Sequence, residues 1–189
     1  MFVKSSVLVL IFILLVGCVT QEKIEGKNEE VLKMKLTSSE FENNALIPSK
    51  YTCDGEQDSP RLKIEDVPEG TKSLVLIMDD PDIPQEVKQA RGINVFDHWV
   101  LFNIDPNTKE IDTNQVPGVQ GSNSAGENKY IGPCPPKQYQ PTMHRYFFKL
   151  YALDIQLDLQ EGSTKTEVEK AMEGHILEQT ELIGKYERK

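Results

Sequence analysis

The longest apolar runs in the chain have the length of β-strands and are separated by turn-forming residues. Residues 73–78 read Ser-Leu-Val-Leu-Ile-Met, a continuous run that is typical of a strand buried on both faces. A second run spans 95–104 and holds the single tryptophan, and a third spans 146–154. Three shorter segments also favour strands: 36–41, the alternating 59–64, and 182–186.

One segment has helical periodicity instead. Thr164 and Glu167 have the spacing of a capping box. Behind them an apolar stripe recurs at helical spacing: Val168, Ala171, Met172, His175 and Ile176. Because His175 lies on this stripe, we interpret it as structural. Residues 85–94 are charged and are predicted to form an exposed loop. Many strands and one late helix predict a mainly β sandwich with a single C-terminal helix.

The N-terminal segment differs from the rest of the chain. Residues 7–16 are almost wholly apolar and have the length of a signal-peptide core. The run ends in Gly17-Cys18, which looks like the lipobox of a bacterial lipoprotein, where the cysteine is lipidated after cleavage. An uncleaved membrane anchor is the alternative, but a spanning helix needs about 20 residues. We predict three parts: a signal peptide at 1–17, a lipidated Cys18 with a flexible tether at 18–34, and one domain at 35–189.

Composition narrows the classes of partner. The chain has 21 Lys and Arg against 30 Asp and Glu, a net charge of −9, and no basic cluster. A nucleic-acid partner would require a basic stripe, so that class is excluded. The predicted location is the outer face of the cytoplasmic membrane, the periplasm or the cell envelope, with the lipid on Cys18 as the membrane anchor.

Two cysteines, Cys53 and Cys134, remain besides Cys18. In an oxidising compartment an even pair suggests a disulfide, and two free thiols are the alternative. No spacing of Cys or His indicates a metal site. The Gly-rich segment 116–130 lacks the strand before and helix after that a phosphate-binding glycine loop requires, so no cofactor is predicted.

Chemically useful side chains lie near strand ends. Asp79, Asp80 and Asp82 follow the run 73–78, and crowded carboxylates beside a core need donors or a proton. Pro81 and Pro84 exclude a helix at this point. His98 lies within a predicted strand, where a histidine on its own is more often a core residue than a ligand.

A stiff loop, Gly132-Pro133-Cys134-Pro135-Pro136, precedes His144-Arg145-Tyr146 at the start of the third apolar run. A rigid loop that brings polar residues to a strand end is a common way to build a binding site. The alternative is a surface loop in which His144 only caps the strand.

In this order and spacing, three segments resemble the phosphatidylethanolamine-binding protein family, in its bacterial and archaeal Raf kinase inhibitor-like branch. They are Asp80-Pro81-Asp82-x-Pro84, His98-Trp99, and the proline loop with His144-Arg145-Tyr146. Further matches lie at 50–55, 59–62, 67–71 and 174–177, so the resemblance covers about 35–188. The chain departs from the branch at Asp58, at Ile64 and in the length of 137–143.

The resemblance implies a two-sheet antiparallel β sandwich with Greek-key connections. It also implies a small anion pocket lined by Asp80, Asp82, His98, Gly132, Pro133, Pro135, His144 and Tyr146. A carboxylate beside an imidazole favours its charged form and orients it. We therefore expect Asp80 and Asp82 to orient and charge the two histidines, which with the Tyr146 hydroxyl would donate to a phosphate or carboxylate.

The expected function is a binding or regulatory protein without turnover, which captures the anionic head group of a small molecule or phospholipid. Two alternatives remain open. One is a protein-interaction role, such as inhibition of a serine protease. The other is weak phosphoesterase activity, because paired Asp and His can act as general acid and base. No cofactor or metal is expected in any of these cases.

Overall fold

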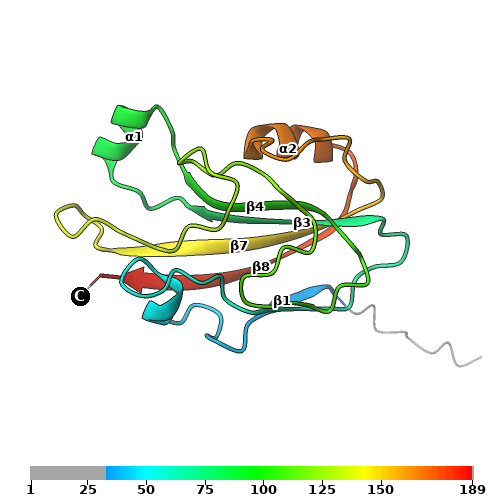
Figure 1. Ribbon diagram of the computed structural model, residues 1–189, viewed down its shortest axis with the longest axis horizontal. Coiled ribbons are helices and arrows are strands. Elements are labelled where there is room, and N and C mark those ends of the chain that lie inside the picture. Colours follow the sequence, from blue (N-terminus) through cyan, green and yellow to red (C-terminus); the bar gives the residue numbers. More distant parts are fainter. Residues whose placement is uncertain (1–32, 189) are drawn as a thin grey trace, which may run out of the picture. The chain divides into compact units, whose positions relative to one another are not determined.

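The computed structural model describes residues 33–188, which form two antiparallel β-sheets and two α-helices (Figure 1). The larger sheet has the order β6 (Val119–Gln120), β4 (Phe96–Ile104), β3 (Ser73–Asp80), β7 (Met143–Leu153) and β8 (Ile176–Glu187). The smaller sheet has the order β1 (Lys35–Thr37), β2 (Leu62–Glu65) and β5 (Glu110–Ile111). A short 3-10 turn, η1 (Ser49–Tyr51), follows β1. The prediction of a mainly β, two-sheet fold is confirmed.

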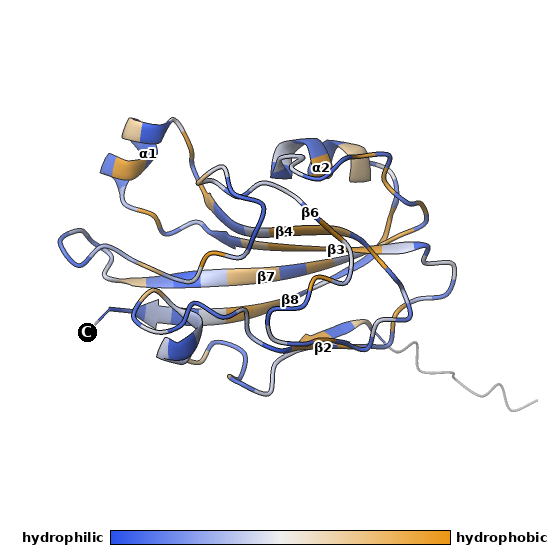
Figure 2. Cartoon of the chain, viewed as in Figure 1, coloured by the Kyte–Doolittle hydropathy of each residue, from blue (hydrophilic) through white to orange (hydrophobic). Residues whose placement is uncertain are grey.

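The larger sheet is covered on both faces, which explains the uninterrupted apolar run in β3 (Figure 2). On one face, Leu74, Leu76 and Met78 pack in the core between the two sheets. On the other face, Val75 and Ile77 pack in a second core beneath α2 (Lys165–Met172). Alternate residues of a strand point to opposite faces, so both sets must be apolar.

The two helices correct the expectation of a single one. The predicted capping box of Thr164 and Glu167 opens α2, which ends at Met172, before His175 and Ile176. The other helix, α1 (Gln85–Arg91), occupies the segment predicted to be an exposed loop. Pro84 is compatible with it because proline lacks only an N–H that the start of a helix does not use, and Gly92 ends the helix with a positive φ of 67°.

Other boundaries also differ from the prediction. The last strand, β8, is longer than 182–186 and begins immediately after the turn that follows α2. The two-residue strands β5 and β6 had no signal in the apolar pattern. Within residues 33–188 no helix is long and apolar enough to cross a membrane. The predicted signal peptide and the predicted lipidation of Cys18 lie outside the described residues.

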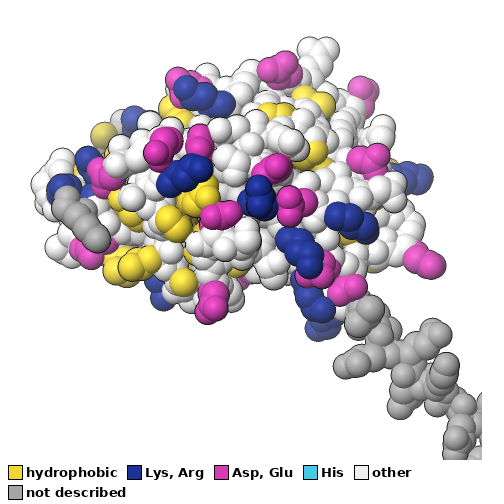
Figure 3. Space-filling model, turned by 60° about the horizontal axis from the view of Figure 1, so that its bottom comes forward, with side chains coloured by type: hydrophobic (Ala, Val, Ile, Leu, Met, Phe, Trp, Pro, Cys, Tyr) yellow, Lys and Arg dark blue, Asp and Glu magenta, His cyan; other side chains and the backbone are white. Residues whose placement is uncertain are grey.

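Charged side chains of both signs are mixed on the face that Figure 3 shows. Figure 3 shows Lys and Arg interspersed with Asp and Glu on one face. Exposed ion pairs on the smaller sheet and beside it include Lys63–Glu65 at 2.9 Å and Lys35–Asp66 at 3.1 Å. The face in Figure 3 therefore carries no basic stripe of the kind that a nucleic acid would require.

Candidate functional site

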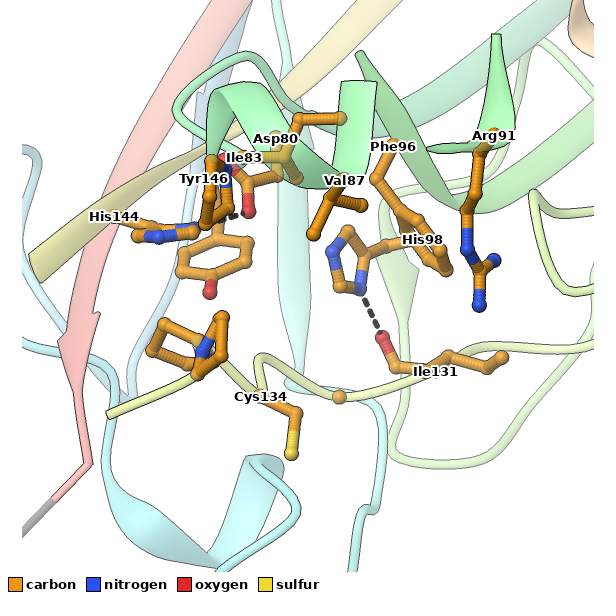
Figure 4. Close-up of a pocket in the computed structure, with 14 residues that line it drawn as sticks. Asp80, Ile83, Val87, Arg91, Phe96, His98, Ile131, Cys134, His144 and Tyr146 are labelled. Carbon is orange, nitrogen blue, oxygen red and sulfur yellow. Dashed lines mark hydrogen bonds and ion pairs between the residues drawn. The ribbon is translucent and has the colours of Figure 1, made fainter. Parts of the chain in front are cut away.

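A cavity of about 270 Å³ opens beside the ends of β3, β4 and β7 and the proline loop (Figure 4). Its wall is mostly apolar, with side chains from α1, from β4 and from residues 131–136. The polar or charged residues on it are Asp80, Arg91, His98, His144 and Tyr146. An apolar cavity with a few convergent polar groups is the usual form of a small-molecule site.

Three of these residues face the cavity because of the two-residue period of their strands. Asp80 continues the β3 face that carries Met78, and His144 and Tyr146 continue the β7 face that carries Phe148. Residues two apart on a strand share a face, so the core-facing sides of both strands lead directly to the cavity. This placement follows from the apolar pattern that defined the strands.

His98 reaches the cavity by a different route. Met78 pairs with Trp99 and Asp79 pairs with Asp97, so His98 is left without a partner in β3. This is a β-bulge, which adds one residue to a strand and redirects a side chain. At the bulge, Asp97 and Asp79 both accept hydrogen bonds from Nζ of Lys165. Phe96 and His98, on either side of Asp97 in the chain, line the cavity instead.

The His98 ring is held in one tautomer. Its Nδ1 lies 2.8 Å from the carbonyl oxygen of Ile131, which can only accept, so Nδ1 carries the proton. Burial lowers the pKa of His98, against the opposing effects of the Ile131 carbonyl and of nearby carboxylates, among them Asp80. The neutral ring therefore presents Nε2 as an acceptor, on the side that faces Tyr146 (Figure 4).

His144 and Asp80 form a buried pair. Nδ1 of His144 lies 2.6 Å from Oδ2 of Asp80, and its Nε2 lies 3.1 Å from the carbonyl oxygen of Pro141. The other oxygen of Asp80 accepts the backbone N–H of Asp82 at 2.8 Å. Both nitrogens of His144 are thus engaged within the protein. The expectation that His144 donates to a ligand is therefore not met by this geometry, in which the His144–Asp80 contact links β7 to β3.

The Tyr146 hydroxyl is the unpaired group of the cavity. Tyr146 is 0% exposed, and its Oη has no hydrogen-bond partner among residues 33–188. Burial raises the pKa of Tyr146, with Asp80 as the next contribution, so the group is a neutral O–H donor. In Figure 4 the hydroxyl points toward the proline loop, across the cavity.

Two predicted site residues do not line the cavity. Asp82 accepts hydrogen bonds from Nε and Nη2 of Arg145, each at 2.7 Å, and has no hydrogen bond to a histidine of residues 33–188. Hydrogen bonding from Arg145 lowers the pKa of Asp82. Pro133 is not among the lining residues, and its carbonyl oxygen accepts the N–H of Cys53 at 3.1 Å.

The proline loop is fastened to η1. Cys53 and Cys134 form a disulfide with a Cα–Cα distance of 5.4 Å, and Cys134 and Pro135 line the cavity. A Cβ on Gly132 would lie 2.7 Å from the carbonyl oxygen of Tyr51, so only glycine allows this close approach. The loop is therefore a fixed wall of the site.

The sequence prediction missed the wall supplied by α1. Ile83, Val87 and Arg91 lie one helical turn apart along one side of α1 and its N-terminal approach, and all three line the cavity. The signal that could have found them is proline before, glycine after and apolar residues four apart. Within residues 33–188 no cluster of three or more His, Cys, Asp or Glu could hold a metal ion.

Comparison with known proteins agrees with this architecture. A family model described as phosphatidylethanolamine-binding protein matches residues 37–187. A UPF0098 protein of Pyrococcus horikoshii is 43% identical over 97% of this chain and 88% of its own length. A UPF0098 protein of Methanothermobacter thermautotrophicus is 46% identical over 82% of this chain and 99% of its own.

Two solved structures are also similar. A putative phosphatidylethanolamine-binding protein homologue from Chlamydia trachomatis has a TM-score of 0.77 and 43% identity, and the match covers 83% of this chain and 99% of that one. The E. coli protein YbcL, described as a new member of the mammalian PEBP family, has a TM-score of 0.72 and 26% identity. The match covers 84% of this chain and 100% of that one.

Proposed function

The chain belongs to the phosphatidylethanolamine-binding protein family, and on that premise we propose that it is a lipid-anchored binding protein outside the cytoplasmic membrane. Its cavity captures a phosphate-type anion, and the lipid on Cys18 holds the domain at the membrane. The anion is the head group of a small molecule or of a phospholipid. The protein binds it without turnover.

The observation that carries this proposal is the Tyr146 hydroxyl. Buried polar groups are nearly always hydrogen-bonded, and one without a partner at a cavity is explained by a bound ligand or water. An O–H donor between apolar walls suits an anionic oxygen, because hydrogen bonds to charged groups are stronger than those between neutral groups.

His98 adds a requirement for a proton. Neutral His98 presents Nε2 as an acceptor, so it repels a fully ionised oxygen but accepts a hydrogen bond from a P–OH group. The bound state therefore holds one proton between Nε2 and the ligand, either on a phosphate monoanion or on an imidazolium that the anion stabilises. A phosphate-type group supports this proposal because it can supply that proton itself near neutral pH.

The binding role is favoured over the enzymatic one by the state of the cavity side chains. Cys134, the thiol nearest the site, is bonded to Cys53 and is not a nucleophile. His144 has its Nδ1 at Asp80 and its Nε2 at the carbonyl oxygen of Pro141, so neither ring nitrogen is free in this structure to exchange a proton with a substrate.

The proposal is tested by calorimetric titration with phosphate and with glycerophosphoethanolamine. We expect Tyr146→Phe to weaken binding of both by about tenfold or more, since a hydrogen bond to a charged group contributes about 1.5–3 kcal/mol. Tyr130→Phe is the matched control, because the Tyr130 hydroxyl donates to the carbonyl oxygen of Tyr51 at 2.7 Å. Equal binding by Tyr146→Phe and the unaltered protein would refute the proposal.

A further inference from the structure

The cavity is larger and more apolar than a phosphate-type anion alone requires. Its volume of about 270 Å³ approaches the lower limit for sites that hold small organic ligands, about 300 Å³. Tyr146 and His98 occupy only part of the wall. Beside the proline loop, the apolar part of the wall includes Ile83 and Val87 at α1 and Phe96 of β4. An apolar body attached to the anion would fill this part and exclude water from it.

Arg91 closes this apolar part with a positive charge. It is the last residue of α1, and its guanidinium lies over the Phe96 ring, 5.6 Å from the ring centre. In Figure 4 Arg91 and Tyr146 lie on opposite sides of the cavity, with His98 and Phe96 between them.

Arg91 is also the exception among the four arginines of the chain. Arg61, Arg145 and Arg188 each pair with an aspartate at 3.1 Å or less. Arg91 forms no ion pair with any carboxylate of residues 33–188, and its Nη1 donates a long hydrogen bond of 3.4 Å to the carbonyl oxygen of Ser124. In a chain with an excess of acidic residues, an arginine without a carboxylate at a cavity is available to a ligand.

We propose that the cavity takes a ligand with two anionic ends and a short apolar body, with Tyr146 and His98 at one end and Arg91 at the other. This inference rests on the proposed function and names its ligand class. One end is the phosphate-type group. The other is a carboxylate or second phosphate within reach of the guanidinium, which binds such groups in a bidentate manner. The body between them lies against Ile83, Val87 and Phe96.

Two probes separate the ends: phenyl phosphate, with one anionic group, and 4-carboxyphenyl phosphate, with two. Calorimetry on the full chain in detergent compares their dissociation constants. We expect 4-carboxyphenyl phosphate to bind about fivefold more tightly, which is the upper range for an exposed ion pair such as one with Arg91. Arg91→Gln should remove this preference, because it weakens binding of 4-carboxyphenyl phosphate more than binding of phenyl phosphate. Arg91→Lys should retain part of it.

Lys170→Gln is the matched control, because it makes the same change of charge on an exposed residue of α2. It should leave the preference intact. Equal affinity of the unaltered protein for the two probes, or a preference that survives Arg91→Gln, overturns the inference while phenyl phosphate binding still supports the proposed function. Absence of binding by both probes overturns the inference and counts against the proposed function as well.

Discussion

Nδ1 of His144 and Oδ2 of Asp80 lie 2.6 Å apart, and their side chains are only 1% and 3% exposed. The contact joins the start of β7 to the end of β3 at the edge of the cavity. A buried pair of this kind contributes little relative to apolar residues, but removal of one partner leaves the other unpaired.

Asp80→Ala should therefore destabilise the fold strongly. It removes the partner of His144 and the acceptor of the Asp82 N–H, and we expect a loss of about 3–5 kcal/mol in the free energy of unfolding. Urea denaturation measures this loss.

Asp82→Ala serves as the control for Asp80→Ala. Its partner Arg145 has a side chain that is 51% exposed, so this pair should contribute no more than about 1 kcal/mol. If the two variants lose similar amounts in the free energy of unfolding, the buried contact of Asp80 with His144 stabilises the fold no more than the exposed pair does.

Burial of neutral His98 predicts a dependence of stability on pH. Because burial lowers the pKa of His98 in the fold, the unfolded chain binds a proton there at a higher pH than the folded chain does. The contribution of His98 is complete above the unfolded value of about 6.5 and is lost as the pH falls toward the folded value. The melting temperature should fall over this range, and less so in His98→Gln.

The pH dependence of sulfate binding tests whether a proton lies between Nε2 of His98 and the bound anion. Sulfate has no proton to give near neutral pH, so its binding must draw one to His98, and its affinity should rise as the pH falls. His175→Gln is the control, since His175 pairs with Asp154 on the surface, 41% and 47% exposed. Sulfate binding that does not change with pH, or that changes equally in His98→Gln, would contradict the proposed proton.

The parts of the fold that could be predicted are those where the spacing of apolar residues indicates a strand or a helix. Local rules predicted three features that the structure contains. They are the run of β3 that is buried on both faces, the apolar run 146–154 that lies mostly in β7, and the capping box that begins with Thr164. In the structure Asp80, His144 and Tyr146 each continue a core-facing row of period two, although the sequence analysis assigned them to the pocket through the family resemblance. The two short strands β5 and β6 could not be found, since their pairing depends on partners far away in sequence.

The role of His98 could not be deduced from its place in a strand, because a β-bulge decides which way it points. Asp82 was misplaced for a related reason. It lies two residues from Asp80 but beyond the end of β3, so strand periodicity no longer applies, and it pairs with Arg145 instead. The cavity wall of α1 was missed because the charged segment 85–94 was interpreted as an exposed loop, whereas a helix begins there directly after Pro84.

Lipidation of Cys18 is testable without a ligand. In a bacterial host that processes lipoproteins, an alkyne analogue of palmitate should label the chain, and Cys18→Ser should abolish the label and release the domain from the membrane fraction. Cys53→Ser is the matched control and should keep its label. Membrane association of Cys18→Ser would indicate the alternative of an uncleaved anchor.

The disulfide between Cys53 and Cys134 should matter for both stability and binding. It closes a loop with a sequence separation of 81, for which the chain-entropy relation gives about 4–5 kcal/mol. The double variant Cys53→Ser, Cys134→Ser should lose about this much in the free energy of unfolding. It should also bind phosphate more weakly, because Cys134 and Pro135 would no longer be fixed as a wall of the cavity.

Reduction of the unaltered protein with a dithiol provides the internal control for that variant. Its melting temperature should fall toward that of the double variant, and the double variant itself should not respond to the reductant. If stability falls as expected while phosphate affinity is unchanged, the bond serves the fold alone, and the wall is held by the close packing of Gly132 on Tyr51 and by the hydrogen bond from Cys53 to Pro133. If affinity falls with stability, the bond positions the proline loop for the ligand.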